Sequence, residues 1–547
     1  MTFRAHMMDC PLMISDILVH AAKCHGGQEI VTRLPETGGI HRETYAEAHT
    51  RTKQLANALR KKLKIREGDR VATIAWNSHR HFELYYGISG MGAVVHTVNP
   101  RLDPKQIVWM LEHAQAKAVF FDKQFAPIVD GISKMCKSVK NWVLMTDKSH
   151  ADAVKTKCKT YEELIAEQSS DFDWPVFDEY TAAGLCYTSG TTGDPKGVLY
   201  SHRSNVLHAM FAMTPDCVPL SSTDVVMPVV PLFHANGWGL AYTSALGGAS
   251  LVMPGRDMTA PGLYEMLEMG VTITAAVPTI WLGMLQHLRQ NKLKFSTLKR
   301  VVIGGSSCPR AVIEAFQLDY GAQVIHAWGM TETSPLGSVC SFKPEVAALS
   351  PSEKLDVQTS VGHPPYGVDL RITDDEENEL PWDGKQQGKL WVRGYGVVKR
   401  YHRMEKDAVE GEDQWFDTGD VATMDANGYV RITDRSKDVI KSGGEWISSI
   451  DLENAAVAHP DVAEAAAIGV PHPKWDERPI LCIVGVGGAQ PPKEEILALI
   501  GEHFAKWQIP DDVIYLDELP HTATGKISKL ELRKKLNGLG YRHPEAA

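Results

Sequence analysis

The chain contains one stretch that decides its class, Tyr187-Thr188-Ser189-Gly190-Thr191-Thr192-Gly193-Asp194-Pro195-Lys196-Gly197-Val198. It follows an apolar run, Ala182 to Cys186, that is typical of a buried strand. Its glycines allow close approach of the backbone, its hydroxyls donate hydrogen bonds and Lys196 supplies positive charge. The pattern G-x-x-x-x-G-K-[ST] is not present here. We therefore predict a phosphate-binding loop of another kind, with a polyphosphate as its ligand.

The sequence on both sides of this loop alternates short apolar runs with helical stretches. Residues 71–75, 94–98 and 118–121 are apolar runs separated by helical patterns, and the rhythm returns at 225–227, 249–252, 272–275 and 301–303. Strands separated by helices of 10–15 residues indicate parallel sheets. We expect an α/β fold whose large N-terminal domain holds two doubly wound sheets.

The pattern changes after about Gly362 to short strands and turns rich in Gly and Asp, which predicts a small β-rich subdomain. A last unit begins near Asp434, with a helix over 450–458, a strand over 465–470 and an amphipathic helix over 493–504. The expected domains are therefore a large N-terminal domain, 1–433, and a small α+β C-terminal domain, 434–547.

Composition excludes several other classes of protein. The 547 residues carry a net charge of −10, which argues against a nucleic-acid partner because phosphate backbones are bound by clustered Lys and Arg. No window reaches 18 uninterrupted apolar residues, so we expect no integral membrane segment and a cytoplasmic protein. Nine cysteines without a CxxC pair indicate neither a disulfide framework nor a zinc cluster.

Five further motifs carry residues suited to nucleotide chemistry. Glu332, in His326-Ala327-Trp328-Gly329-Met330-Thr331-Glu332-Thr333, offers the carboxylate that Mg²⁺ prefers. Asp420 can accept hydrogen bonds from two neighbouring hydroxyls, and Arg435 can donate to hydroxyl or phosphate oxygens. The remaining two motifs are the turn Gly304-Gly305-Ser306-Ser307 and the segment Leu519-Pro520-His521-Thr522-Ala523-Thr524-Gly525-Lys526-Ile527.

In this order, over roughly residues 30–540, the motifs resemble those of the superfamily of acyl-CoA synthetases, peptide-synthetase adenylation domains and beetle luciferases. The resemblance implies ATP, Mg²⁺ and coenzyme A as cofactors, with Glu332 as the metal ligand. It also implies a homodimer, since family members are often dimers. The implied ATP and AMP site comprises Thr188, Ser189, Gly190, Thr191, Thr192, Gly193, Lys196, Gly305, Ser306, Ala327, Trp328, Gly329, Met330, Thr331, Asp420 and Arg435.

The resemblance also implies a mobile C-terminal domain that turns about Asp434. In one orientation Lys526 would bridge the carboxylate and the α-phosphate during adenylation. In the other, Lys441, Gly443, Gly444 and Glu445 would line a tunnel for coenzyme A. The expected catalytic residues are Lys526, Glu332, Thr188 and His234, and the expected acyl pocket contains His234, Trp238 and Gly305.

The sequence bears on three rival functions. An amino-acid-activating module would have Asp at the position of His234, and a non-catalytic binding protein would not be expected to keep Lys196, Glu332, Asp420, Arg435 and Lys526 together. Luciferase-like oxidation shares the adenylation step and stays open. The absence of a G-x-S-x-G match removes the usual acyl-hydrolase alternative.

The acid itself is predicted from overall similarity within the family. The chain resembles medium- and long-chain fatty acyl-CoA ligases and their relatives acting on 3-methylmercaptopropionate, and the bulky Trp238 would shorten the pocket. We expect a ligase for a short- or medium-chain acid, with 3-methylmercaptopropionate as the single best candidate. The alternative is a medium- or long-chain fatty-acid ligase.

Overall fold

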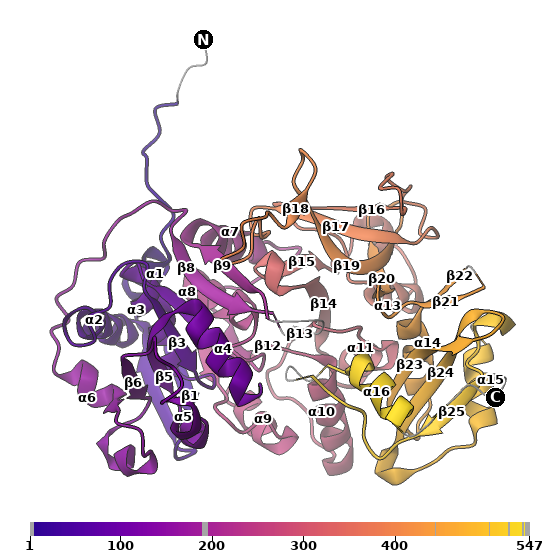
Figure 1. Cartoon of the computed structure of the whole chain (residues 1–547), viewed down its shortest axis with the longest axis horizontal. Coiled ribbons are helices and arrows are strands. Elements are labelled where there is room, and N and C mark those ends of the chain that lie inside the picture. Colours follow the sequence, from indigo (N-terminus) through magenta and orange to yellow (C-terminus); the bar gives the residue numbers. More distant parts are fainter. Residues whose placement is uncertain are drawn as a thin grey trace.

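The computed structural model describes residues 5–188, 195–443, 445–502, 504–522, 526–538 and 541. The chain forms four sheets: two large ones from residues 29–339 and two smaller ones that follow in the central and C-terminal parts (Figure 1). The expected α/β fold is confirmed, with its two large sheets, its β-rich unit and its smaller C-terminal unit.

The first large sheet has seven strands in the order β7-β6-β5-β3-β4-β8-β9. All pairs are parallel except β8 with β9, which flank the predicted phosphate loop. The strands are β3 (Arg70–Ile74), β4 (Val94–Thr97), β5 (Ala116–Phe121), β6 (Asn141–Leu144), β7 (Lys159–Thr160), β8 (Ala182–Tyr187) and β9 (Gly197–Ser201). The helices between them are α3 (His79–Gly90), α4 (Pro104–Ala114), α5 (Ala126–Ile132) and α6 (Tyr161–Ala166).

The second large sheet has eight strands in the order β15-β14-β13-β12-β10-β11-β1-β2. Its inner pairs are parallel, and the edge strands β2 and β15 are antiparallel to their neighbours. The strands are β1 (Glu29–Arg33), β2 (Ile40–Thr44), β10 (Val225–Pro228), β11 (Ser250–Met253), β12 (Ile273–Ala276), β13 (Arg300–Ile303), β14 (Gln323–Gly329) and β15 (Leu336–Val339). The sequence patterns did not reveal the β1–β2 hairpin.

One large apolar core joins the two sheets. It includes Val95 and Phe120 from the first sheet and Leu251 and Ile273 from the second, all at most 1% exposed. Helices packed on or between these sheets are α1 (Ile14–Cys24), α2 (Tyr45–Lys61), α7 (His202–Ala212), α8 (Leu240–Gly247), α9 (Ala260–Leu267), α10 (Pro278–Asn291) and α11 (Arg310–Glu314). The carboxyl ends of the parallel strands, where ligands usually bind, are thereby held on a rigid base.

The two smaller sheets complete the chain. The antiparallel third sheet contains β16 (Val368–Thr373), β17 (Gly388–Gly394), β18 (Val409–Glu410), β19 (Trp415–Met424) and β20 (Val430–Arg435). The fourth contains β21 (Ile440–Ser442), β22 (Glu445–Ile447), β23 (Val462–His472), β24 (Asp476–Gly485) and β25 (Asp512–Tyr515). Helices α12 (Pro344–Ala347) and α13 (Pro351–Gln358) precede the third sheet, and α14 (Ser449–Val457), α15 (Lys493–Gly501) and α16 (Lys529–Gly538) pack on the fourth. Helix α15 ends three residues before the expected Phe504.

None of the helices among the described residues combines the length and hydropathy needed to cross a bilayer.

Candidate active site

The predicted phosphate loop connects β8 to β9. Its two ends are tied together: the Thr188 amide donates to the Lys196 carbonyl at 2.9 Å, and the Lys196 amide donates to Thr188 Oγ1 at 3.1 Å. Lys196 Nζ lies 5.0 Å from the centre of the Tyr401 ring. Five predicted ligands of the loop lie outside the described residues, namely Ser189, Gly190, Thr191, Thr192 and Gly193.

Glu332 lies in the single turn Thr331–Thr333 that follows β14, and it is 7% exposed. Its Oε1 accepts a hydrogen bond of 2.8 Å from the Tyr401 hydroxyl. Burial raises the pKa of the Glu332 carboxyl, and the Tyr401 bond and the charges of Arg435 and Lys196 oppose that rise. A buried carboxylate in this setting gains from a nearby cation, so the residue fits the predicted role of metal ligand.

Asp420, on β19, is 2% exposed and joins two other predicted residues. Its Oδ1 is 2.8 Å from Arg435 Nε, and its Oδ2 accepts from Trp328 Nε1 at 2.9 Å. Burial raises the pKa of Asp420, while Arg435, Trp328 and Lys526 favour the charged form. Strands β14, β19 and β20 thus bring the aromatic, acidic and basic members of three separate motifs together.

Lys526 lies in the same group although it is about 90 residues beyond Arg435. Its Cε is 3.7 Å from where a Cβ on Gly305 would lie. Burial lowers the pKa of Lys526 to about 8, helped by Arg435 and opposed by the carboxylates of Asp420 and Glu332. The C-terminal unit is therefore oriented with its lysine directed into the N-terminal site.

Gly304 and Gly305 form the turn after β13, and Gly305 has a φ of +86°. A Cβ on Gly304 would lie 2.9 Å from the Ala327 carbonyl oxygen and 3.3 Å from Trp238 Cη2. Only glycine gives the indole this close approach to the backbone. Of the other predicted nucleotide residues, Ser306 is exposed, and Gly329, Met330 and Thr331 are partly buried at the end of β14 and in the turn after it.

Trp238 belongs to an unusual left-handed turn after β10. Residues 235–239 all have positive φ, and three of them, Ala235, Asn236 and Trp238, are not glycine. Each such residue costs about 1 kcal/mol, which the surroundings must offset. The turn follows directly on His234, whose pKa is lowered to about 4 by burial and by the charge of Lys526. His234 is thus near Lys526, and the Trp238 indole lies against the Gly304–Gly305 turn.

The residues expected in the second orientation lie apart from this group. Lys441 and Gly443 belong to the β21–β22 hairpin at the outer edge of the fourth sheet (Figure 1). The Gly443 amide donates to the Trp475 carbonyl at 2.9 Å. Gly444 and the side chain of Glu445 are outside the described part of the chain.

Asp434, the predicted pivot, is 1% exposed at the end of β20. Its Oδ2 accepts from the Ser449 amide at 2.8 Å and from the Ser449 hydroxyl at 2.5 Å, and its Oδ1 accepts from the Arg435 amide at 2.7 Å. Asn454, on α14, donates to Ser307 Oγ at 3.0 Å, so α14 also contacts the turn after β13.

Sequence reasoning missed Tyr401 and Asn454. Tyr401 contacts both Glu332 and Lys196, but it stands in Lys399-Arg400-Tyr401-His402, which has no motif or periodicity to single it out. Only the three-dimensional arrangement reveals either residue.

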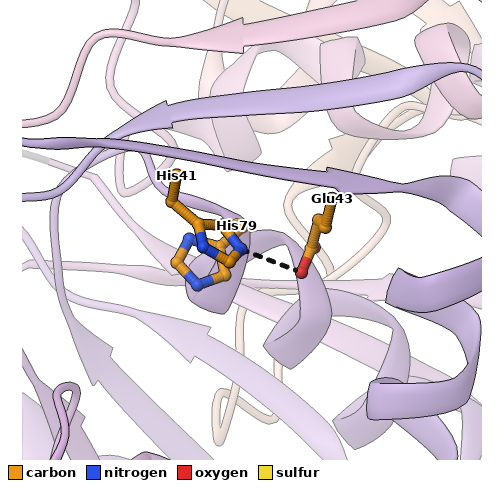
Figure 2. A group of neighbouring side chains, drawn as sticks. All are labelled: His41, Glu43 and His79. Atoms are coloured by element: carbon orange, nitrogen blue, oxygen red, sulfur yellow. Dashed lines mark hydrogen bonds and ion pairs between the residues drawn. The ribbon is translucent and has the colours of Figure 1, made fainter.

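A separate group of His41, Glu43 and His79 could in principle hold a metal ion (Figure 2). His41 Nε2 lies 3.4 Å from Glu43 Oε2, but the two imidazoles are stacked, with centres 4.0 Å apart and planes 26° apart. Lone pairs lie in the ring planes, so nearly parallel stacked rings do not converge on one ion. The Arg51 guanidinium, 3.3 Å from the same Glu43 oxygen, further disfavours a cation there.

Comparison with known proteins agrees with this geometry. The AMP-binding enzyme family model matches residues 18–402, and the model of the AMP-binding enzyme C-terminal domain matches residues 451–526. The chain therefore belongs to the AMP-binding enzyme family and, within it, to the ATP-dependent ligases that join an acid to the thiol of coenzyme A.

Its relatives include a 3-methylmercaptopropionyl-CoA ligase of Ruegeria lacuscaerulensis, 48% identical over 96% of this chain and 98% of that protein. A medium-chain-fatty-acid–CoA ligase of Ectopseudomonas oleovorans is 46% identical over 97% of each chain. Among solved structures, an anthranilate CoA ligase in complex with anthranoyl-AMP superposes with a TM-score of 0.86 at 25% identity, covering 98% of this chain and all of the other.

Proposed function

We propose that this enzyme activates a short carboxylic acid, 3-methylmercaptopropionate or a close analogue, through an acyl-AMP intermediate. The observation that carries the proposal is the position of the Trp238 indole against Gly304 and beside Gly305 and Lys526, where it would close the end of an acyl pocket. The relative acting on 3-methylmercaptopropionate, at 48% identity, supports the same acid.

In the first half-reaction a carboxylate oxygen attacks the α-phosphorus of ATP, and the bond from that phosphorus to the bridging oxygen of pyrophosphate breaks. The products are acyl-AMP and pyrophosphate. Lys526 would neutralise charge on the carboxylate and the α-phosphate, and Lys196 and the loop would hold the outgoing phosphates. Because the step makes no covalent bond to the protein, positioning and charge stabilisation supply the catalysis.

The nucleotide would be held by the group built around Asp420. Its carboxylate can accept from both ribose hydroxyls, and Arg435 can donate to ribose or phosphate oxygens. Trp328, fixed by its bond to Asp420, would flank the adenine together with the Gly305–Ser306 turn. Mg²⁺ would be held by Glu332, supplying positive charge beside the phosphates.

In the second half-reaction the thiol sulfur of coenzyme A attacks the acyl carbon, AMP leaves with the electron pair of the broken C–O bond, and the thiol proton is released to solvent. Lys526 occupies the site in the orientation described here, so we propose that the C-terminal unit turns about Asp434 before this step. The β21–β22 hairpin, with Lys441, Gly443, Gly444 and Glu445, would then line the entrance for the thiol.

The alternative acid is a medium- or long-chain fatty acid, which the 46% identical medium-chain ligase supports. The two readings differ in whether Trp238 blocks the pocket or turns aside for a longer chain. The homodimer and the cytoplasmic location stay predictions.

Separating the half-reactions tests the proposed mechanism. Lys526→Ala should lower acid-dependent exchange between ATP and pyrophosphate by roughly 100-fold or more, because one charge-stabilising contact is lost in the first step only. Thioester formation from supplied acyl-AMP should stay within about threefold of wild type. Equal loss in both assays would contradict the assignment of Lys526 to adenylation.

A further inference from the structure

Asn77, outside every predicted motif, makes three buried hydrogen bonds to the segment that leads into the acyl pocket. Its Nδ2 donates to the Pro228 carbonyl at 2.7 Å and to the Val230 carbonyl at 2.9 Å. Its Oδ1 accepts from the Leu232 amide at 2.7 Å. The side chain is 3% exposed, so water cannot replace these partners. All three bonds require an amide, which both donates and accepts.

Tyr85, on α3, binds the same segment. Its hydroxyl donates to the Leu232 carbonyl, so both backbone groups of Leu232 are bound by side chains of residues 77–85. The tyrosine ring is fully buried. Leu232 therefore has a fixed position relative to α3.

Leu232 in turn contacts the left-handed turn that carries Trp238. A Cβ on Gly237 would lie 2.5 Å from Leu232 Cδ2 and 3.2 Å from Leu232 Cα. A shift of Leu232 would therefore be transmitted to Gly237 and to the adjacent Trp238. On the opposite side, Thr97 Oγ1 donates to Asn236 Oδ1 at 3.1 Å, which helps to hold the strained turn.

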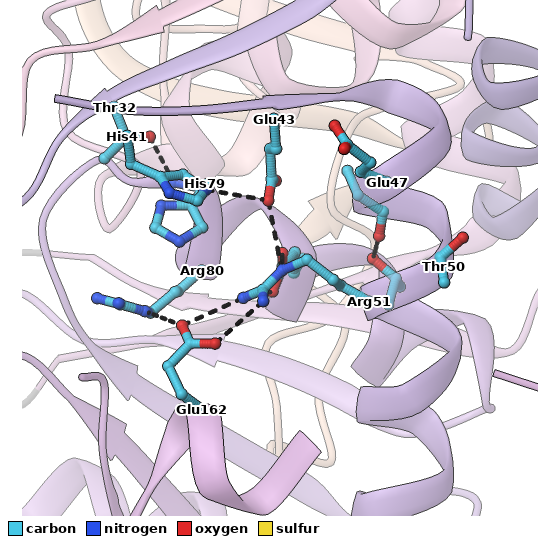
Figure 3. A network of polar contacts seen from close by, with 12 residues as sticks. Thr32, His41, Glu43, Glu47, Thr50, Arg51, His79, Arg80 and Glu162 are labelled. Carbon is cyan, nitrogen blue, oxygen red and sulfur yellow. Dashed lines mark hydrogen bonds and ion pairs between the residues drawn. The ribbon is translucent and has the colours of Figure 1, made fainter. Parts of the chain in front are cut away.

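The start of α3 is itself held by a partly buried network of charges (Figure 3). Arg80 pairs with Glu36 at 2.8 Å and with Glu162 at 2.7 Å, and Arg51 pairs with Glu162 at 3.0 Å. The His79 amide donates to Thr32 Oγ1 at 2.9 Å, and Ser78 caps the helix. These contacts lie on elements away from Lys526, and they give Asn77 a rigid base.

We propose that Asn77, assisted by Tyr85, is a positioning residue that sets the place of Trp238 and thereby the length of acid the pocket accepts. The proposal rests on the proposed function, because it needs Trp238 to be a wall of the acyl pocket. Neither Asn77 nor Tyr85 contacts the reacting atoms. Their effect is transmitted through the backbone of residues 228–232.

Asn57 provides a matched control. It is also 3% exposed, and its amide donates to two loop carbonyls, Ser169 at 2.8 Å and Asp171 at 2.9 Å. The loop that Asn57 binds, residues 169–171, does not include the acyl-pocket segment 228–232. Asn57→Ala therefore removes two amide-to-carbonyl bonds outside the pocket, and its melting temperature shows how far lost stability alone changes activity.

The experiment compares kcat/KM for 3-methylmercaptopropionate and octanoate in wild type, N77A, Y85F, N57A and W238A, with the melting temperature of each. N77A should change the ratio of the two values by at least about tenfold in favour of octanoate, and Y85F in the same direction by less. N57A should leave the ratio within about twofold, and the KM for ATP should stay near wild type in every variant.

The possible outcomes distinguish the acyl-pocket role of Trp238 from the positioning role of Asn77 and Tyr85. If W238A leaves the ratio unchanged, the acyl-pocket assignment fails. If W238A changes the ratio but N77A and Y85F do not, or if N57A changes it equally, the positioning role is wrong. Y85F removes a single hydroxyl, so it gives a result even where N77A does not fold.

Discussion

Lys526 has a pKa of about 8, which follows from burial and from Arg435. The role in adenylation that we propose for it needs the charged ammonium form. The kcat/KM for adenylation reports the free enzyme. On the alkaline side it should therefore fall about tenfold per pH unit above about 8, as the proton is lost.

Lys526→Arg separates this residue from other titrating groups. Guanidinium stays charged at every pH used, so this variant, though slower, should show no alkaline fall up to about pH 10. The measurement is pyrophosphate exchange from pH 6 to 10. The same alkaline limb in both enzymes would show that another group titrates.

Sequence reasoning was strongest at this scale. Glu332, Asp420, Arg435 and Trp328 were each singled out by their motif, and the structure brings them together with Lys526. Tyr401 and Asn77 could not be found in this way. Each acts through contacts to residues far away in the chain, and a single sequence carries no trace of such contacts.

At the scale of the elements, the left-handed turn 235–239 fixes the backbone conformation that carries the Trp238 indole. Ala at position 238 would keep the same positive φ at a similar cost, so W238A removes the indole without changing the backbone strain. Longer acids should gain up to about 0.8 kcal/mol for each added CH₂ that becomes buried, and short acids should lose roughly 1–3 kcal/mol in kcat/KM.

The indole also packs against the main apolar core, so some loss of melting temperature is expected whatever its role. The informative measurement is therefore the sign of the change in kcat/KM of W238A for each of four acids, namely butyrate, 3-methylmercaptopropionate, octanoate and palmitate. A uniform drop for all four acids would make Trp238 a structural residue.

The β19–β20 pair and α14 meet at Asp434, where the pivot prediction can be tested. Proline fixes φ near −65°, so Asp434→Pro should hold the C-terminal unit in one orientation. Adenylation should survive, and thioester formation should fall by at least about tenfold.

Proline also removes the carboxylate that binds Ser449, so Asp434→Ala is the necessary control. The alanine variant loses the same carboxylate bonds but leaves φ unrestricted. It should therefore slow thioester formation much less than the proline variant does. Similar rates for the two variants would show that the carboxylate, rather than rotation, limits the step.

The two parallel sheets could be predicted because apolar runs separated by helical stretches are visible in the sequence. These patterns did not reveal the β1–β2 hairpin or the left-handed turn. In Ile40–Thr44 only Glu43 is buried, so apolar and polar residues do not alternate as in a typical strand, and a run of positive φ in Ala-Asn-Gly-Trp-Gly contradicts local preference. Tertiary contacts, such as those of Asn77 with the preceding segment, impose such conformations.

At the scale of the whole molecule, the C-terminal unit completes the site. Lys526 reaches Gly305 only because the fourth sheet and its helices lie beside the second large sheet, with Asn454 bound to Ser307 (Figure 1). This arrangement suits adenylation and leaves the β21–β22 hairpin at the periphery. The resemblance to the family implies both orientations, but it does not predict which one the structure adopts.

The most direct test is the acid specificity of the wild-type enzyme. We would measure AMP release and acyl-CoA formation with ATP and coenzyme A for acids from acetate to palmitate, including 3-methylmercaptopropionate. The kcat/KM should be highest for 3-methylmercaptopropionate or an acid of equal length, and at least about tenfold lower for palmitate, whose chain would meet the Trp238 indole. A maximum at octanoate or longer would contradict the proposal of a short acyl pocket closed by Trp238.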